Sequence, residues 1–140
     1  MKKTARRAFI TRRLAFSAAH RLQSDELSAA ENRRVFGKCN YPNGHGHNYV
    51  LEVTIAGPID ATTGMVFNLT DLKEVMTEVV DRDFDHKNLN MDVSEFRTLN
   101  PTAENIAAVL WDRLQKRLKP GLLHEVRLIE TENNFVSYRG

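Results

Sequence analysis

Two stretches of the chain alternate between apolar and polar residues. The even positions from Ala8 to His20 are apolar except at Arg12 and at His20 itself. The odd positions from His45 to Ile55 carry two histidines followed by apolar residues. Alternation at period two is typical of a strand with one face against a core. The sequence therefore predicts one strand that ends at or near His20 and a second strand that begins near His45.

Two other stretches repeat apolar residues every three or four positions, which is the period of an α-helix. The first follows Asn68, a residue type that favours the N-cap position, and its apolar stripe covers residues 69–80. The second opens at Thr102, has its last inward apolar residue at Leu118 and stops at Pro120. We therefore expect two amphipathic helices after the two strands.

The remaining patterns complete the order of elements. Ser28 and Glu31 are spaced as a capping box, which predicts a short helix between the first two strands. Two late strands, 122–132 and 134–138, are expected to meet in a hairpin at Asn133-Asn134. The order strand, strand, helix, helix, strand, strand favours an α+β fold, with a four-stranded antiparallel sheet and the two long helices on one face.

Composition and charge are those of a single globular domain over residues 1–140. Hydrophobic residues make up 41% and charged residues 27% of the chain, and the net charge is only +2. A basic run without acidic residues opens the chain, and we expect residues 1–7 to form a flexible basic leader. The small net charge does not indicate nucleic acid as a partner.

Membrane and redox signals are weak. No apolar run reaches the roughly 20 residues that a membrane helix needs, so we expect no membrane partner. The chain has one cysteine, which rules out an intrachain disulfide and suits a reducing compartment. We therefore expect a cytoplasmic protein.

Three histidines can face one metal ion. His45 and His47 lie two positions apart on a predicted strand, so their side chains point to the same face. His20 ends the other early strand on its apolar face, so a third imidazole can join them if the two strands are neighbours. Three neutral histidines leave coordination positions open, which is typical of catalytic zinc. The alternative is that His45 and His47 are turn histidines bonded to the backbone. His124, on a late strand, is interpreted as a surface or core histidine.

Cys39 lies six residues before His45, across a Pro-Asn-Gly turn. A loop of this length can fold back and bring the sulfur to the open side of the metal. A thiol near a dication and near Lys38 would favour its thiolate form, which can act as a base or a nucleophile. Two other roles stay open at this point: a fourth zinc ligand and a small buried apolar side chain.

Three further residues can take part in acid–base chemistry or binding. Asp85 and His86 place a carboxylate beside an imidazole in an acidic loop, which can serve as a proton relay or can be a solvated turn. Glu130, at the end of a strand, can accept two parallel N–H bonds from a guanidine-like ring edge. A surface glutamate is the alternative for Glu130.

From about Phe16 to its C-terminus the chain resembles the 6-pyruvoyltetrahydropterin synthase family. The motifs that carry the resemblance are, in order, FSAAHRL, FGKCNYPNGHGHNY, GMVFNLTDLK, DHKNLNMDV, PTAENIA and ETENN. The resemblance implies the tunnelling fold, in which the sheets of three subunits close into a barrel. It also implies a homohexamer built as a dimer of trimers, with active sites at subunit interfaces.

The resemblance also implies roles for the candidate residues. The zinc ligands would be His20, His45 and His47, and Cys39 would be the general base. Asp85 and His86 would complete a proton relay from a neighbouring subunit.

For substrate binding, the resemblance implies that Glu130 anchors a pterin and that Thr102 lies near it. Position 103 is Ala103, where many members carry a second hydroxyl-bearing residue. One contact to the pterin is therefore in doubt.

The reaction implied by the resemblance converts 7,8-dihydroneopterin triphosphate to 6-pyruvoyltetrahydropterin and releases triphosphate. The alternative within the family is 6-carboxytetrahydropterin synthase of the queuosine pathway, which also releases acetaldehyde. The spacing from Cys39 to His45 favours the pyruvoyl branch. A third hypothesis is a non-enzymatic zinc module that binds RNA through the basic leader. Against it, the basic residues are not interleaved with aromatic residues beyond Phe9.

Overall fold

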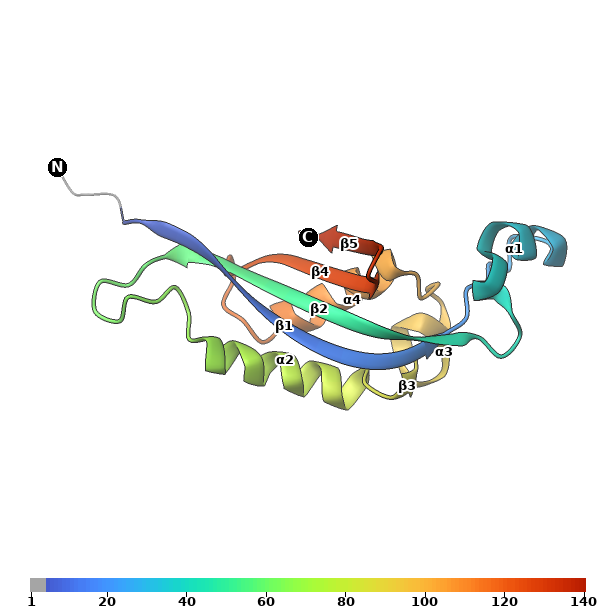
Figure 1. Ribbon diagram of the computed structural model, residues 1–140, viewed down its shortest axis with the longest axis horizontal. Helices are drawn as coiled ribbons and strands as arrows, with labels where there is room; N and C mark the ends of the chain where they lie inside the picture. The colour runs from blue at the N-terminus through green and yellow to red at the C-terminus, as the bar shows by residue number, and fades with distance from the viewer. Residues whose placement is uncertain (1–4) are drawn as a thin grey trace.

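The computed structural model describes residues 5–140. Within this range five strands form one sheet in the order β3-β1-β2-β4-β5. The long antiparallel hairpin of β1 and β2 runs along the length of the molecule (Figure 1). All neighbouring strands are antiparallel except β3, which runs parallel to β1. The strands are β1 (Arg7–His20), β2 (His45–Pro58), β3 (Lys87–Asn88), β4 (Leu123–Thr131) and β5 (Asn134–Tyr138).

The helices supply the second layer of an α+β fold. They are α1 (Ala29–Phe36), α2 (Leu69–Asp83), α3 (Leu89–Asp92) and α4 (Ala103–Gln115), with 3-10 turns η1 (Gly37–Asn40) and η2 (Ser94–Arg97). The long helices α2 and α4 bury their apolar stripes with the inward positions of β1 and β2 in one core. No helix among residues 5–140 is long and apolar enough to cross a membrane.

The expected α+β class is confirmed, but the expected number of strands is wrong. The sequence predicts four strands, whereas β3 adds a fifth beside β1 at the edge of the sheet. A two-residue strand has no alternating pattern to read. It forms because the chain that follows α2 is held against Ala18 and Ala19 of β1.

The predicted helix starts are confirmed by their side-chain caps. Ser28 and Glu31 form the expected capping box at α1. The Asn68 side chain accepts a hydrogen bond from Thr70 N at 2.9 Å, and Thr102 caps α4. A polar side chain that accepts an otherwise unpaired N–H of the first turn stabilises the start of a helix. The starts could therefore be located from residue type and spacing alone.

Three predicted boundaries differ from the structure. Helix α4 ends at Gln115, although Leu118 beyond it is still buried in the core. The hairpin between β4 and β5 turns at residues 132–133, because Asn134 already pairs with Thr131 across the strands. Residues 1–4 of the expected leader lie outside the described residues, and Arg7 is the first residue of β1.

The register of β1 and β2 places the polar ends of both strands side by side. His20 is paired with His45, and Ala18 with His47. Further along the same face Phe16 and Tyr49 stack with ring centroids 5.1 Å apart. The inward faces of both strands therefore carry the histidines where β1 ends and β2 begins, and carry the hydrophobic core along the rest of their length.

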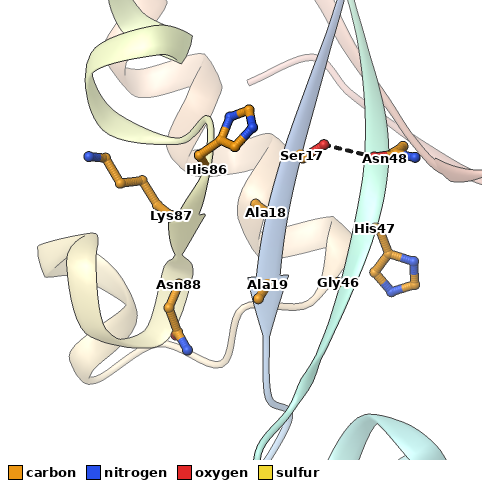
Figure 2. A pocket seen from close by; sticks show the side chains of 9 residues that line it. All are labelled: Ser17, Ala18, Ala19, Gly46, His47, Asn48, His86, Lys87 and Asn88. Atoms are coloured by element: carbon orange, nitrogen blue, oxygen red, sulfur yellow. Dashed lines mark hydrogen bonds between the residues drawn. The ribbon is translucent and has the colours of Figure 1, made fainter.

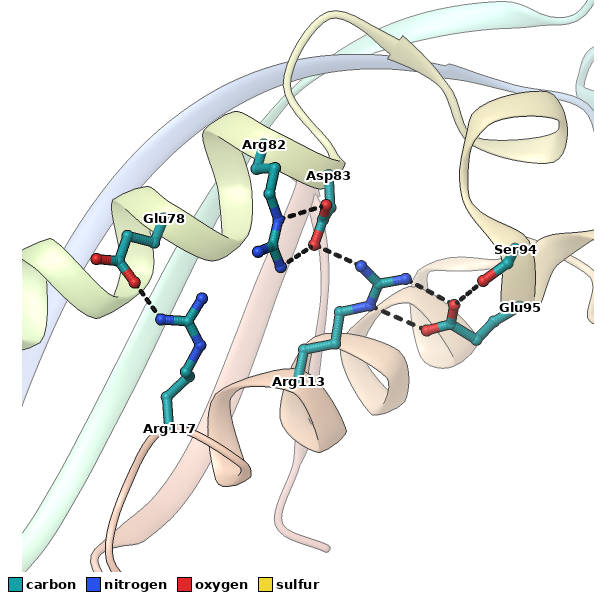
Figure 3. A network of polar contacts seen from close by, with 7 residues as sticks. All are labelled: Glu78, Arg82, Asp83, Ser94, Glu95, Arg113 and Arg117. Atoms are coloured by element: carbon teal, nitrogen blue, oxygen red, sulfur yellow. Dashed lines mark hydrogen bonds and ion pairs between the residues drawn. The ribbon is translucent and has the colours of Figure 1, made fainter.

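An ionic network joins α2, η2 and α4 on the helix side of the molecule (Figure 3). The Arg113 guanidinium lies 2.5 Å from Asp83 Oδ2 and 2.6 Å from Glu95 Oε1. The hydrogen bonds from Arg113, together with one from Ser94, lower the pKa of Glu95 from 4.5 to about 2. The ionised form of Glu95 is thus strongly favoured in the folded chain.

The Glu95 ion pair should make stability depend on pH in the acid range. Because the folded pKa lies below the unfolded one, its contribution is full above about pH 4.5 and is lost as pH falls toward about 2. We expect Glu95→Gln to lower the midpoint of thermal unfolding at pH 6 and to have little effect near pH 2. Melts followed by circular dichroism between pH 6 and pH 2 measure this. An equal gap between the two proteins at every pH would contradict it.

Candidate metal centre

The three candidate histidines converge at one end of the β1–β2 hairpin, as the strand parity predicts. His20 closes β1, and His45 and His47 open β2 on the same face of the sheet. Gly44, which precedes β2, has φ of 68°, and a Cβ there would lie 2.5 Å from the His20 carbonyl oxygen. Only glycine fits this close approach without a shift of the backbone.

The ring nitrogens are close enough to share one ion. His45 Nε2 lies 3.2 Å from His20 Nε2 and 2.9 Å from His47 Nε2. One ligand atom from each of the three histidines lies within 4.8 Å of the others. Tetrahedral zinc bonds of about 2.0–2.1 Å place ligand nitrogens about 3.3 Å apart. The donor set and its spacing therefore fit a zinc ion with one position left open.

Backbone carbonyls set the tautomer of two of these histidines. Nδ1 of His20 lies 2.7 Å from the Pro101 carbonyl oxygen, and Nδ1 of His45 lies 3.3 Å from the Lys38 carbonyl oxygen. A carbonyl oxygen can only accept, so Nδ1 carries the proton and Nε2 keeps its lone pair. Such outer hydrogen bonds orient metal-binding histidines in general. The ligands are thus oriented by the fold itself.

Burial disfavours the protonated forms of His20 and His47. It lowers the pKa of His20, which is 1% exposed, and that of His47, while the negative charge of Glu130 acts in the opposite direction on both. Metal binding requires the unprotonated imidazole. The fold therefore favours the metal-binding form of His20 and His47.

Cys39 lies in η1, partly buried, on the loop that connects α1 to β2. Its backbone is tied to the end of β1, because Leu22 N donates to the Cys39 carbonyl oxygen at 2.8 Å. Burial and then the charge of Glu130 raise the pKa of the Cys39 thiol. The protein groups alone thus favour the neutral thiol, whereas the sequence suggested a thiolate favoured by Lys38 and a dication.

Glu130 lies between the histidine cluster and a cavity. Its Oε1 is 3.8 Å from His47 Nε2, and its side chain is 20% exposed. A cavity of about 600 Å³ next to it is lined by Glu130, Thr102, Ala103 and aromatic residues that include Phe36. The structure therefore brings Glu130 and Thr102, which are far apart in sequence, to one recess beside the histidines.

Asp85 and His86 lie elsewhere, at the edge of the sheet formed by β3. The Asp85 carboxylate accepts from Ser17 N at 2.9 Å and lies 2.9 Å from His86 Nδ1. These bonds, that of Ser17 first, lower the pKa of Asp85. His86 has φ of 59°, an uncommon left-handed conformation for a side-chain-bearing residue. The two neighbours in sequence therefore do face each other.

Within one chain this pair is separate from the histidine cluster. The His86 side chain is 82% exposed, and it lies on one side of β1 while His47 points away on the other side of the hairpin (Figure 2). His86, Lys87 and Asn88 line a cavity of about 400 Å³ that reaches across β1 to residues 46–48 of β2, which include His47.

The structure adds groups that the sequence did not indicate. The carbonyls of Lys38 and Pro101 orient metal-site histidines, and a backbone carbonyl carries no signal in residue type. Tyr49 packs its ring against His47 and is fully buried, and its hydroxyl has no hydrogen-bond partner among the described residues. Its place two residues after His47, on the same face, could have pointed to it.

Comparisons with known proteins agree with this geometry. Residues 9–140 match the family described as 6-pyruvoyl tetrahydropterin synthase. The chain is 54% identical to the human 6-pyruvoyl tetrahydrobiopterin synthase over 133 residues, which cover 95% of this chain and 92% of the human one. It is 31% identical to a 6-carboxy-5,6,7,8-tetrahydropterin synthase of Rickettsia felis, over 90% of this chain and 96% of the other. A solved Caenorhabditis elegans 6-pyruvoyl tetrahydropterin synthase superimposes with a TM-score of 0.93 at 44% identity, covering 97% of each chain.

Removal of one imidazole from the cluster should abolish stable metal binding. We expect His47→Ala to reduce zinc affinity by about 100-fold or more, because two histidines cannot complete the site. Zinc per chain after dialysis, measured by plasma mass spectrometry, gives the answer. His124→Ala is the matched control, since His124 contacts Phe9 and lies outside the cluster. Full zinc retention in His47→Ala would contradict the three-histidine site.

Proposed function

This chain belongs to the 6-pyruvoyl tetrahydropterin synthase family and is a lyase with a pterin substrate, and we propose how its residues divide the reaction. The substrate is 7,8-dihydroneopterin triphosphate, and the products are 6-pyruvoyltetrahydropterin and triphosphate. The observation that carries this proposal is the three-histidine cluster next to the recess lined by Glu130 and Thr102. The chain is 54% identical to the human pyruvoyl synthase and 31% identical to the Rickettsia felis carboxy synthase, which favours the pyruvoyl product.

The metal is Zn²⁺, held by Nε2 of His20, His45 and His47. This assignment is supported by the lowered pKa of His20 and His47 and by the backbone carbonyls that accept from Nδ1 of His20 and His45. When bound, the ion supplies a Lewis acid and a positive charge that favours the thiolate of a nearby cysteine.

Cys39 is the general base of the proposed mechanism. The hydrogen bond from Leu22 N to the Cys39 carbonyl oxygen holds the Cys39 backbone beside the end of β1 that carries His20. Burial and Glu130 raise the pKa of the thiol, so Cys39 stays protonated unless a cation offsets them. The proposed thiolate form of Cys39 therefore depends on the bound cation.

Asp85 and His86 form the second part of the proton relay. Asp85 is fixed by Ser17 N and accepts from His86 Nδ1, so His86 Nε2 is the nitrogen free to exchange a proton. Because the His86 side chain is exposed and lies across the hairpin from His47 (Figure 2), we assign the pair to the site of a neighbouring subunit.

The subunit arrangement that we propose is the one implied by the family resemblance, a homohexamer built as a dimer of trimers. Among the described residues, β3 pairs with β1 only at Ala18 and Ala19, so most of the outer edge of β1 lacks a partner within the chain. Closure of three sheets into a barrel would pair such edges.

The single cysteine of the chain supports a cytoplasmic location.

Substrate binding falls to the recess next to the cluster. Glu130 accepts N–H bonds from the pterin ring edge, as a bidentate carboxylate can. Thr102 Oγ1 already accepts from Asn105 N at 3.2 Å, which leaves its hydroxyl proton free to donate to the ligand. Ala103 lines the same recess and offers no hydroxyl, so Thr102 is the hydroxyl donor at this helix start.

The proposed reaction is tested by product identification. The zinc-loaded protein is incubated with 7,8-dihydroneopterin triphosphate, and the products are identified by mass spectrometry. We expect 6-pyruvoyltetrahydropterin and triphosphate. A 6-carboxytetrahydropterin product with acetaldehyde would instead assign the chain to the carboxy branch. No reaction, together with steeply salt-dependent binding of RNA, would favour a non-enzymatic zinc module.

Cys39→Ala separates catalysis from metal binding. Because the thiol moves protons but holds no metal in this proposal, we expect full zinc content and a turnover reduced by about 10²- to 10⁴-fold. Turnover and zinc per chain are measured on the same preparation. Near-normal turnover would exclude Cys39 as the general base, and loss of zinc would instead assign it as a fourth ligand.

A further inference from the structure

One arginine on α4 holds both ends of the segment that carries the Asp85–His86 pair. Arg113 Nη1 donates to Asp83 Oδ2 at 2.5 Å, just before that segment leaves α2 (Figure 3). Its Nε and Nη2 donate to the two carboxylate oxygens of Glu95 at 3.0 and 2.6 Å, just after α3. The guanidinium thus bonds the residue before and the residue after the segment 84–94.

Arg113 also contacts the residue directly before the pair. Its guanidinium carbon lies 5.4 Å from the centroid of the Phe84 ring. Phe84 is fully buried and packs edge-on against Phe16 of β1, with ring centroids 6.2 Å apart. A side chain anchored on both sides cannot rotate freely, so the backbone that enters Asp85 has a fixed direction.

The inner side of the segment is tied to β1. Besides the bond to the Asp85 carboxylate, His86 N donates to the Ser17 carbonyl oxygen at 2.6 Å. Asn90 bonds both the N–H and the carbonyl of Arg21, at 2.7 and 2.9 Å, one residue after the candidate ligand His20. The segment is therefore clamped between Arg113 on one side and the metal-bearing strand on the other.

Arg113 is the only cation in the Figure 3 network that bonds both Asp83 and Glu95. Arg82 also pairs with Asp83, but Ser94 is the only other side chain in the Figure 3 network that bonds Glu95. The Arg113 side chain is 21% exposed, so its ion pairs are better shielded from water than most surface pairs. Loss of the guanidinium would leave Glu95 without a cationic partner in this network, and η2 without its tie to α4.

We propose that Arg113 is a positioning residue for the Asp85–His86 pair, which it orients by holding both ends of residues 84–94. The inference rests on the proposed function, in which this pair takes part in proton transfer. Arg113 itself touches no reacting group. Its effect passes through Phe84 and the two carboxylates, and displacement of a catalytic group by about 1 Å can reduce rates about 100-fold.

The test compares Arg113→Gln with Arg117→Gln in the zinc-loaded protein. Arg117 lies two residues after the end of α4 and pairs with Glu78 of α2, so its loss removes a nearby cation without touching the segment. For Arg113→Gln we expect kcat to fall about 10- to 100-fold while KM changes less than about threefold. Zinc content should be unchanged. Hydrogen exchange followed by mass spectrometry should become faster in residues 84–94 but not in residues 45–55.

Three outcomes would overturn the proposal: an unchanged kcat, an equal loss of kcat in Arg117→Gln, or faster exchange throughout the chain. His86→Ala, measured in parallel, tests the proposed relay separately. If His86→Ala keeps full turnover, the proposed relay is wrong. The exchange data then decide whether Arg113 positions residues 84–94, and unchanged exchange in Arg113→Gln overturns that proposal. If Arg113→Gln does not fold, Arg113→Lys replaces it, because lysine keeps the charge but lacks the fork that reaches both carboxylates.

Discussion

The antiparallel register between β1 and β2 is the constraint on which the rest of the structure depends. It pairs His20 with His45 and Ala18 with His47, so three imidazoles share one face. A slip of one residue would turn the His20 ring to the opposite face of the sheet and would also expose the core. The hydrophobic row from Phe16 and Tyr49 onward therefore fixes the metal site as firmly as it fixes the fold. Gly44 allows the chain to enter this register, because any side chain there would collide with the carbonyl of His20.

Glu130 connects the electrostatics of the metal cluster, the candidate base and the recess. Its negative charge raises the pKa of His20, His47 and Cys39, whereas burial lowers the pKa of the histidines and raises that of the thiol. At the histidines the two effects oppose each other and burial is larger, so the rings stay neutral. At the thiol they act together. One carboxylate next to the recess thus favours a cation in the cluster and makes the ionisation of Cys39 depend on that cation.

Helix α4 organises the site from both of its ends. At its start, the Pro101 carbonyl orients His20 and Thr102 faces the recess shared with Glu130. Near its end, Arg113 holds the segment that presents Asp85 and His86. Because Thr102 and Arg113 lie near the two ends of one helix, the helix fixes the distance between them, and its packing against β4 and β5 fixes where both lie. Packing of this helix has consequences for chemistry at two separate places.

Sequence alone determined what depends on local pattern. Period-two alternation placed the three histidines on one face, and the capping residues Ser28, Asn68 and Thr102 marked the helix starts. Tertiary structure alone decided what depends on segments distant in sequence: the short strand β3, the end of α4, and the carbonyls that set the histidine tautomers. It also decided that Asp85 and His86 lie apart from the cluster of their own chain. A strand period or a helix cap is encoded within a few residues, whereas a hydrogen bond from His20 to Pro101 spans 81 positions and arises only when the core has formed.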